Sequence, residues 1–184
     1  MILIVSQIIG VCAVGLYLLS YQLKKRSHIV WVTCISNALY VLQYILLGAF
    51  SGAIMDTLST VGSFLAGAKH SPRLSAYTKW IAGANLLIIA VTGITIAVVQ
   101  RDPVELIPIL GAVFQTGGLW YEDEQKIRRY GLCSAPFWLV YNFISQAYGA
   151  ALGSVLAIVS AATALIRYRK AKHTYKENIY EDFN

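Results

Sequence analysis

The chain has 184 residues, of which 57% are hydrophobic and only 13% are charged, and its formal net charge is +6. The runs 1–23, 80–100 and 130–166 contain no charged residue at all, which is more apolar surface than a soluble domain of this length can bury. This composition excludes an ordinary soluble domain and predicts an all-α integral membrane protein whose main partner is the lipid bilayer. The positive charge lies in short segments between the apolar runs and near the C-terminus, so we do not expect nucleic-acid binding.

Taken in chain order, the apolar runs predict seven membrane-spanning helices. Each run is closed by a charged cluster or by a short turn that contains glycine. The expected spans are 2–23, 29–47, 53–68, 79–99, 104–120, 130–147 and 151–166.

An internal repeat organises these spans, because residues 10–69 align without a gap on residues 111–170. The pattern Tyr-x7-Gly-Ala-x2-Gly occurs in both copies, and identical pairs include Tyr40/Tyr141, Gly48/Gly149 and Gly52/Gly153. Each copy carries three spans, and the fourth span has no counterpart. We therefore expect a 3+1+3 plan: a first three-helix bundle at 1–69, a loop and linker helix at 70–103, a second three-helix bundle at 104–170 and a cytosolic tail at 171–184.

The distribution of lysine and arginine predicts the orientation of the spans. With the N-terminus outside and the C-terminus inside, only Arg101 of the 15 lysine and arginine residues falls on the outer side. Positive residues are favoured on the cytoplasmic side of a membrane. Two three-span units joined directly would be antiparallel, so the one extra crossing of the fourth span makes the two bundles parallel, related by an axis along the membrane normal.

The 3+1+3 plan, the charged cluster after the first span and the short glycine turn resemble the MtN3/SWEET/PQ-loop superfamily. The chain as a whole more closely resembles the YgjV-type family of bacterial inner membrane proteins, and the segment from Asp102 to Gly111 carries the best local likeness. The first resemblance implies a solute path between the bundles, with proline hinges in both repeats. Here the hinge candidates are Pro108 and Pro136 in the second repeat, with the turn residues Gly48 and Gly149. The second resemblance implies a multi-pass protein of the cell inner (plasma) membrane.

Asp56 is the only acidic residue inside an expected span. A carboxyl group at membrane depth is costly to ionise and usually faces the interior of the helix bundle, where it suits proton coupling, gating or solute binding. The alternative is a structural acid that caps a helix or bonds a neighbouring hydroxyl group. Ser59 and Ser160, which are repeat mates near mid-membrane, are further candidates for the same role.

Aromatic and amide side chains on the second and sixth spans are the candidates for solute binding. Trp138 and Asn142 lie one helical turn apart with Tyr141 beside them, and Asn37, Tyr40 and Tyr44 share a face of the second span. Flat aromatic rings beside amides hold polar solutes that have apolar faces. The alternative is interhelical hydrogen bonding and aromatic packing, which is also the expected role of Asn85 and Gln115.

These observations predict a transporter of a small polar solute, for example a sugar, that moves through a cavity between the repeats. The alternative is a membrane receptor or scaffold that transports nothing. The three cysteines are isolated and the histidines have no ligand spacing, so we expect neither a metal site nor a cofactor. No catalytic motif is present, and we do not expect an enzyme.

Overall fold

The computed structural model describes residues 2–160, 162–163 and 166, and within them the chain is helical and contains no strand. The helices are α1 (Ile2–Gln22), α2 (Arg26–Leu47), α3 (Phe50–Ala68), α4 (Thr78–Gln100), α5 (Ile107–Leu119), α6 (Glu124–Ile144) and a last helix, Tyr148–Ser160. Short 3-10 helices, η1 (Ser75–Tyr77) and η2 (Pro103–Leu106), precede α4 and α5. Over these residues the expected all-helical fold and its seven helices are confirmed, while the predicted tail 171–184 lies outside them.

Local sequence signals account for the ends of these helices. Gly48 ends α2 in a left-handed conformation (φ 73°), which glycine adopts without strain. Asp102 and Asp123 accept hydrogen bonds from the N–H groups of Val104 and Gln125, and so cap η2 and α6. Because Asp123 is the cap, the charged residues that follow it form the first turns of α6. This helix therefore begins before the span expected at 130–147.

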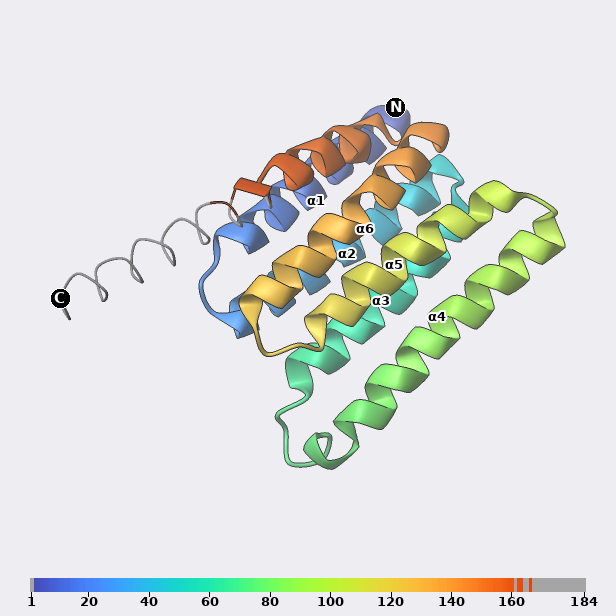
Figure 1. Ribbon diagram of the computed structural model, residues 1–184. Coiled ribbons are helices and arrows are strands. Elements are labelled where there is room, and N and C mark those ends of the chain that lie inside the picture. Colours follow the sequence, from blue (N-terminus) through green and yellow to red (C-terminus); the bar gives the residue numbers. More distant parts are fainter. Residues whose placement is uncertain (1, 161, 164–165, 167–184) are drawn as a thin grey trace, which may run out of the picture.

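Six of the helices form a ring. Within it α1 packs on α2, α2 on α3, α3 on α5 and α5 on α6, and the last helix runs beside α1 (Figure 1). The ring closes through side chains: Gln7 accepts a hydrogen bond from the N–H group of Gly149 at 3.0 Å, and Gln22 donates to Ser160 at 3.3 Å. The remaining helix, α4, packs outside the ring against α3 and α5.

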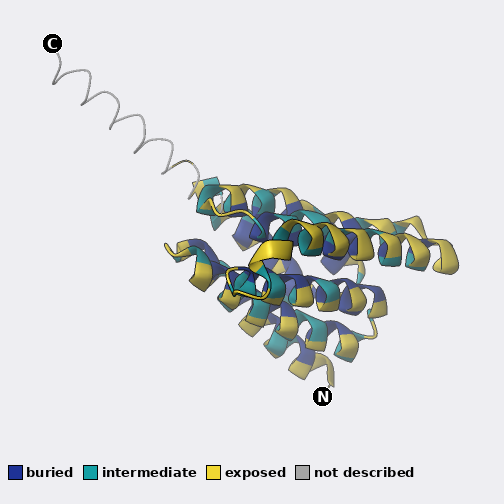
Figure 2. Ribbon diagram, turned by 90° about the horizontal axis from the view of Figure 1, so that it is seen from below, coloured by how far each residue is buried: buried dark blue, intermediate teal, exposed yellow. Residues whose placement is uncertain are grey.

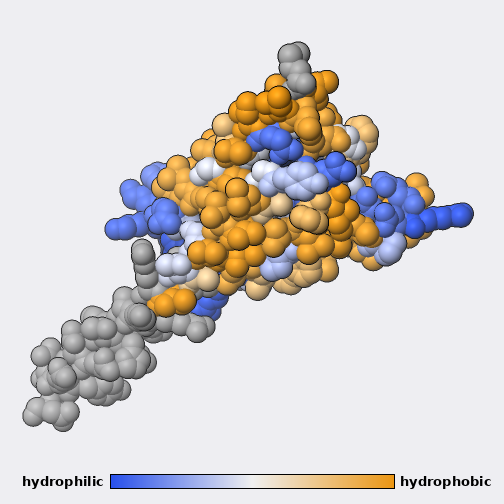
Figure 3. Space-filling view, turned by 90° about the horizontal axis from the view of Figure 1, so that it is seen from above, coloured by the Kyte–Doolittle hydropathy of each residue, from blue (hydrophilic) through white to orange (hydrophobic). Residues whose placement is uncertain are grey.

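Apolar side chains cover the outside of this ring, and many polar side chains lie inside it. Ile4, Leu87 and Val99 are among the exposed residues, whereas Ser36, Asn37 and Ser59 are fully buried. Figure 2 shows exposed positions on the outward faces of the helices and buried ones between them. In Figure 3 hydrophobic residues dominate the face, and hydrophilic ones lie at its left and right margins and in a patch in its upper middle. This distribution is typical of a protein surrounded by lipid.

In the part of the chain that the structure describes, three helices are long and apolar enough to cross a membrane by themselves: Ile2–Gln22, Arg26–Leu47 and Ser75–Gln100. The helices Pro103–Leu119 and Tyr148–Ser160 are apolar but shorter. The hydropathy of α3 is lowered by buried polar side chains such as Asp56 and Ser63, and that of α6 by its charged first turns. Their polar groups face the inside of the ring or its end, which is why α3 and α6 are less apolar than those three helices.

Candidate functional site: a polar cavity at the centre of the helix ring

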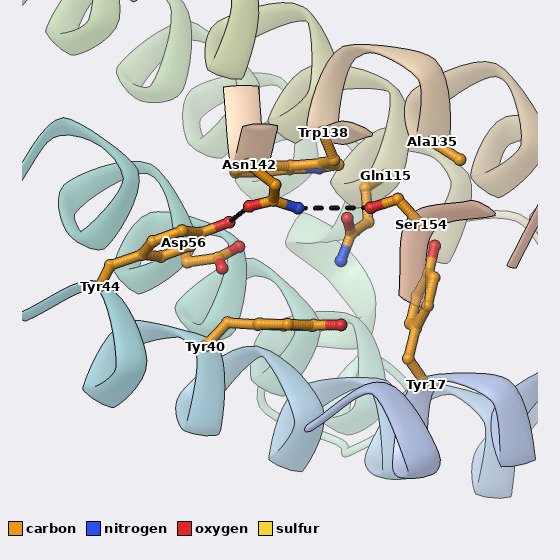
Figure 4. A pocket seen from close by; sticks show the side chains of 9 residues that line it. All are labelled: Tyr17, Tyr40, Tyr44, Asp56, Gln115, Ala135, Trp138, Asn142 and Ser154. Atoms are coloured by element: carbon orange, nitrogen blue, oxygen red, sulfur yellow. Dashed lines mark hydrogen bonds between the residues drawn. The ribbon is translucent and has the colours of Figure 1, made fainter. Parts of the chain in front are cut away.

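A cavity lies at the centre of the ring, and every helix of the ring contributes to its wall. The lining residues come from α1 to α3, α5, α6 and the last helix, and none comes from α4: Tyr17, Tyr40, Tyr44, Asp56, Gln115, Ala135, Trp138, Asn142 and Ser154 (Figure 4). Its volume is about 20 Å³, which is enough for one water-sized group. The cavity thus belongs to both repeats together.

Three aromatic rings form a stack along one wall of the cavity. The Tyr44 ring lies between Tyr40, at 6.4 Å between centroids and 26° between planes, and Trp138, at 6.3 Å and 20°. Tyr40 and Tyr44 lie one turn apart on α2, so helical spacing places them on the same face. Trp138 comes from α6, and its stacking on Tyr44 joins the first repeat to the second.

A chain of hydrogen bonds crosses the cavity next to this stack. The Tyr44 hydroxyl group donates to Oδ1 of Asn142, whose Nδ2 donates to Oγ of Ser154 at 3.3 Å. Ser154 donates in turn to the carbonyl oxygen of Ala150 at 3.1 Å. These bonds connect α2, α6 and the last helix, and they fix the orientation of the Asn142 amide.

Asp56 places a carboxyl group in the same space. Its side chain projects from α3 toward the rings of Tyr40 and Tyr44, and the residue is only 3% exposed (Figure 4). Among the residues drawn, Asn142, Tyr44 and Ser154 are hydrogen bonded, whereas the Asp56 carboxyl group is not. Burying a carboxyl group this deeply is costly unless it is hydrogen bonded or paired with a charge, which makes Asp56 the residue of the cavity best suited to proton exchange or gating.

A second, open cavity of about 590 Å³ lies at the end of the ring that carries the turns at Gly48 and Gln146. We call it the vestibule. Its polar wall includes Ser51, Glu105, Ser145 and Tyr141. The Tyr141 hydroxyl group lies 2.9 Å from that of Ser51 and accepts a hydrogen bond from the N–H group of Gly52 at 2.8 Å. The Tyr141 ring also contacts Tyr44 and Trp138 edge to face, at 5.9 and 6.2 Å between centroids, so this side chain separates the vestibule from the central cavity.

A third cavity, of about 20 Å³, continues from the central one toward the opposite end of the ring. Tyr17 and Gln115 line both cavities, and the third adds Tyr21, Thr33 and Arg128 among others.

Basic side chains close the ring beyond the third cavity. Arg26 donates to the carbonyl oxygens of Tyr121 and Leu119, each at 2.8 Å, and Lys69 donates to that of Trp120 at 2.7 Å. Cations at the C-terminal end of a helix such as α5 are favoured by its exposed carbonyl groups. We call Arg26, Lys69 and the segment 119–122 the latch.

Glu122 completes the latch, with Oε1 lying 2.5 Å from Nζ of Lys69 and Oε2 lying 3.5 Å from Nε of Arg26. Partial burial raises the pKa of the Glu122 carboxyl group, but the hydrogen bond from Lys69 and the positive charges of Arg26, Lys69 and His70 outweigh it. The pKa of Glu122 therefore lies below its ordinary value. The latch ties the start of α2 and the end of α3 to the loop between α5 and α6.

Comparison with known proteins places the chain in a family. A family model described as Imp-YgjV, bacterial inner membrane protein, matches residues 4–172. The chain belongs to the YgjV family of bacterial inner membrane proteins. The match covers all seven helices and agrees with the lipid-facing surface of the ring, so this is a multi-pass protein of the bacterial inner membrane. No curated protein and no solved structure matches the chain.

In this YgjV-family protein, four of the candidate residues meet in the central cavity, namely Tyr40, Asp56, Trp138 and Asn142. The other candidates lie elsewhere. Asn37 is fully buried beside the cavity, where it donates to Ser63 at 3.3 Å and accepts from Gln115 at 2.7 Å. Tyr141 lies between the vestibule and the cavity, as described above.

The two candidate serines do not line the cavity, and they differ from each other. Ser59 is fully buried in α3, and its hydroxyl group has no hydrogen-bond partner within the described part of the chain. Ser160 is half-buried at the end of the last helix, where it accepts a hydrogen bond from Gln22. Their equivalence in the repeat is therefore not matched by equivalent surroundings.

The hinge candidates of this YgjV-family chain also differ in their placement. Pro136 lies inside α6, where it removes a backbone hydrogen bond, whereas Pro108 lies in the first turn of α5, where a proline fits without loss. Gly48 forms a left-handed turn, and Gly149 donates its N–H group to Gln7. Of these four, Pro136 has the position expected for a bend within a span.

Tyr17, Gln115 and Ser154 were not predicted as lining residues. A signal for Tyr17 was present, since it lies one turn beyond Ala13 and Val14 and one turn before Tyr21, all of which are buried. Gln115 was expected to serve only as an interhelical contact, but it lines two cavities as well. Ser154 follows the repeated Gly153 directly, and only its contact with Asn142 reveals its role.

Proposed function

We propose that this protein transports a small polar solute across the bacterial inner membrane along the axis of the helix ring. The observation that carries the proposal is the series of three cavities along this axis. Tyr141 lines the vestibule and its ring contacts Tyr44 and Trp138 of the central cavity, and the central cavity shares the wall residues Tyr17 and Gln115 with the third. A polar path along the axis of a ring of apolar-coated helices is what a membrane carrier requires, and a packed structural bundle does not need it.

The topology we propose has seven spans in the 3+1+3 plan, with the N-terminus outside and the C-terminus inside. The vestibule then opens to the outer side and the latch lies on the cytoplasmic side. The concentration of lysine and arginine at the latch end supports this orientation. The proposed state is open outward and closed inward, so a solute would enter at the vestibule and leave after the latch separates.

Within the cavity, Trp138, Tyr40 and Asn142 are the proposed contacts of the solute, and Asp56 is the proposed site of proton exchange or gating. Transport is either passive or coupled to a proton. The volume of about 20 Å³ means that a sugar enters only if the aromatic stack and Tyr141 move apart, whereas a solute of a few atoms needs a smaller opening.

Thiol labelling tests the existence of the path. In a background in which Cys12, Cys34 and Cys133 are replaced, Ser154→Cys reports on the central cavity. Ser145→Cys, in the vestibule, is the positive control. We expect a charged, water-soluble thiol reagent to label Ser145→Cys rapidly from the outside. It should label Ser154→Cys slowly, and from the inside as well under conditions that open the latch.

A lipid-facing control keeps this test interpretable. Val61 is exposed on the outside of the ring, where lipid would cover it, so Val61→Cys should resist the charged reagent. If Ser154→Cys is as unreactive as Val61→Cys from both sides in a folded protein, the path does not open and the proposal is overturned.

The second candidate function is a membrane receptor or scaffold that moves no solute. The latch and the tight central cavity favour it, because both give the closed ring extra contacts. Labelling separates the two functions, since a permanently closed ring leaves Ser154→Cys unlabelled while the protein still binds a partner.

A further inference from the structure

We propose that the central cavity binds a small ammonium-type cation, either ammonium itself or a short primary amine, with Asp56 as its counter-ion. This inference rests on the proposed function, because it names the class of solute that the path takes. Its first support is the charge of the path. The vestibule and the central cavity contain two ionisable carboxyl groups, Glu105 and Asp56, and neither cavity is lined by a lysine or an arginine.

Both carboxyl groups are short of hydrogen-bond partners. One oxygen of Glu105, Oε2, is buried and has none within the described part of the chain. The Asp56 carboxyl group is 3% exposed, and Figure 4 shows it without a bond to any other residue of the cavity. Protonation of Asp56 does not supply the missing hydrogen-bond partners, because the O–H group of a neutral carboxylic acid itself needs an acceptor. A cation in the cavity supplies both the missing charge and the missing donors.

The aromatic rings favour an ammonium-type cation over an alkali ion. The faces of tyrosine and tryptophan rings carry partial negative charge and attract ammonium groups. Tyr40, Tyr44 and Trp138 present such a stack beside Asp56. An alkali ion needs a shell of oxygen ligands in place of these faces. An ammonium group instead directs N–H donors toward the carboxylate and the hydroxyl oxygens, and its carbon or hydrogen atoms toward the rings.

The size of the cavity sets the upper limit for the ligand. About 20 Å³ accommodates one water-sized group, and ammonium has that size. A short primary amine requires a modest displacement of Tyr40 or Tyr141. The third cavity, on the latch side, is lined by the positively charged Arg128 and not by a carboxyl group. The region that attracts a cation therefore ends at the central cavity.

Thermal unfolding of the purified full-length protein in detergent tests this inference. Ammonium chloride and methylammonium chloride are compared with potassium chloride and sodium chloride at equal concentration. Because a ligand that binds only the folded state stabilises it, we expect a saturable rise in Tm with the two ammonium salts and not with the other two. Potassium is the stringent control, since its size is close to that of ammonium. An equal response to potassium overturns the proposal.

Two variants locate the site. Asp56→Asn keeps the shape of the side chain and removes its charge, and we expect it to weaken ammonium binding by roughly a hundredfold or more. Asp102→Asn removes an exposed acid at the vestibule end of the ring, outside both cavities. This variant should bind ammonium as the wild type does. A normal ammonium response in Asp56→Asn overturns the proposal.

Trp138→Leu keeps the test decisive if Asp56→Asn does not fold. It retains the carboxyl group but loses the indole face, and we expect ammonium to bind about tenfold more weakly. An unchanged response of Trp138→Leu contradicts the aromatic part of the site.

Binding in detergent does not depend on transport. Ammonium binding without uptake of any solute by vesicles would therefore refute the transport function alone, and uptake of another solute without ammonium binding would refute this inference alone.

Discussion

The hydroxyl group of Tyr141 lies 2.9 Å from the hydroxyl group of Ser51, and this pair joins the second repeat to the first at the start of α3. The same Tyr141 oxygen accepts the N–H group of Gly52 at 2.8 Å. That N–H belongs to the first turn of α3, where no helical carbonyl group is available to it. Tyr141 thus caps α3 and closes the passage between the vestibule and the central cavity.

Tyr141→Phe is expected to loosen this closure while retaining the ring. The variant leaves the buried N–H group of Gly52 without its partner, which costs about 1–3 kcal/mol of unfolding free energy. The labelling rate of Ser154→Cys from the vestibule side should rise in the same background. The control is Tyr148→Phe, because the Tyr148 side chain is exposed and outside this contact. Faster labelling in Tyr148→Phe but not in Tyr141→Phe would contradict the assignment.

Gly52→Ala tests the same contact from the other side. A Cβ atom at Gly52 would lie 2.6 Å from Cε1 of Tyr141, so the ring must move. We expect a loss of about 1–3 kcal/mol, as for other insertions into a packed interior. Gly15→Ala is the matched control, since nothing lies within 4 Å of a Cβ atom there. Its stability should rise slightly, because alanine favours a helix interior more than glycine does. Equal losses in both variants, measured by unfolding in mixed micelles, would contradict the close approach.

The hydrogen bond between Gln115 and Asn37 should couple α5 to α2. Nε2 of Gln115 donates to Oδ1 of Asn37 at 2.7 Å, and both residues are buried. Gln115→Leu leaves Oδ1 of Asn37 without its hydrogen-bond donor, so the double variant Asn37→Leu, Gln115→Leu should lose less stability than the sum of the single variants. The coupling energy expected for interhelical bonds of this kind in membranes is about 0.6–1.7 kcal/mol.

A control variant completes this double-mutant comparison of Asn37 and Gln115. Thr95 is exposed on α4 and bonds only within its own helix, to the carbonyl oxygen of Val91. The changes in unfolding free energy caused by Thr95→Val and Gln115→Leu should therefore be additive. A coupling near zero between Asn37 and Gln115 would show that the bond does not contribute.

The latch should weaken in acid. The pKa of Glu122 is lower in the folded state than its ordinary value of 4.5, so its contribution to stability is complete above that value and is lost as the pH falls through the lowered pKa. Glu122→Gln should remove this part of the pH dependence of Tm, whereas Asp102→Asn, at the other end of the ring, should retain it. The effect is expected to be small, because the Glu122 side chain is 63% exposed and solvent screens its charge. An unchanged acid profile in Glu122→Gln would show that the latch does not depend on this carboxyl group.

The helices and part of the cavity could be predicted because both follow from local patterns. Charge-free runs and glycine turns define the helices, and a spacing of three or four residues places Tyr40 and Tyr44 on one face of α2. Asp56 and Trp138 stood out because a charged group inside an apolar span, or a tryptophan away from its ends, usually faces the interior of a bundle.

The remaining features depend on contacts between distant segments. The packing of α6 and the last helix brings the Tyr141 hydroxyl group to Ser51 and places Ser154 next to Asn142. The repeat in the sequence does not specify either contact. The repeat was misleading for Ser59 and Ser160, because the two copies meet different neighbours in the ring. Arg26 and Lys69 were interpreted only as orientation signals, since the carbonyl groups of Leu119 and Trp120 that they bind at the end of α5 lie 93 and 51 residues away in sequence.

Uptake by proteoliposomes shows whether this protein carries a solute across a membrane. Vesicles containing the purified protein are supplied with labelled ammonium analogues, sugars and other small polar metabolites, with and without a pH gradient. We expect saturable uptake of at least one solute, lost in Asp56→Asn and Trp138→Leu but retained in Asp102→Asn. Dependence on the gradient would assign proton coupling to Asp56, and independence would make the protein a passive carrier. Uptake that is unaffected by Asp56→Asn and Trp138→Leu, or no uptake of any solute by a folded protein, would contradict the account.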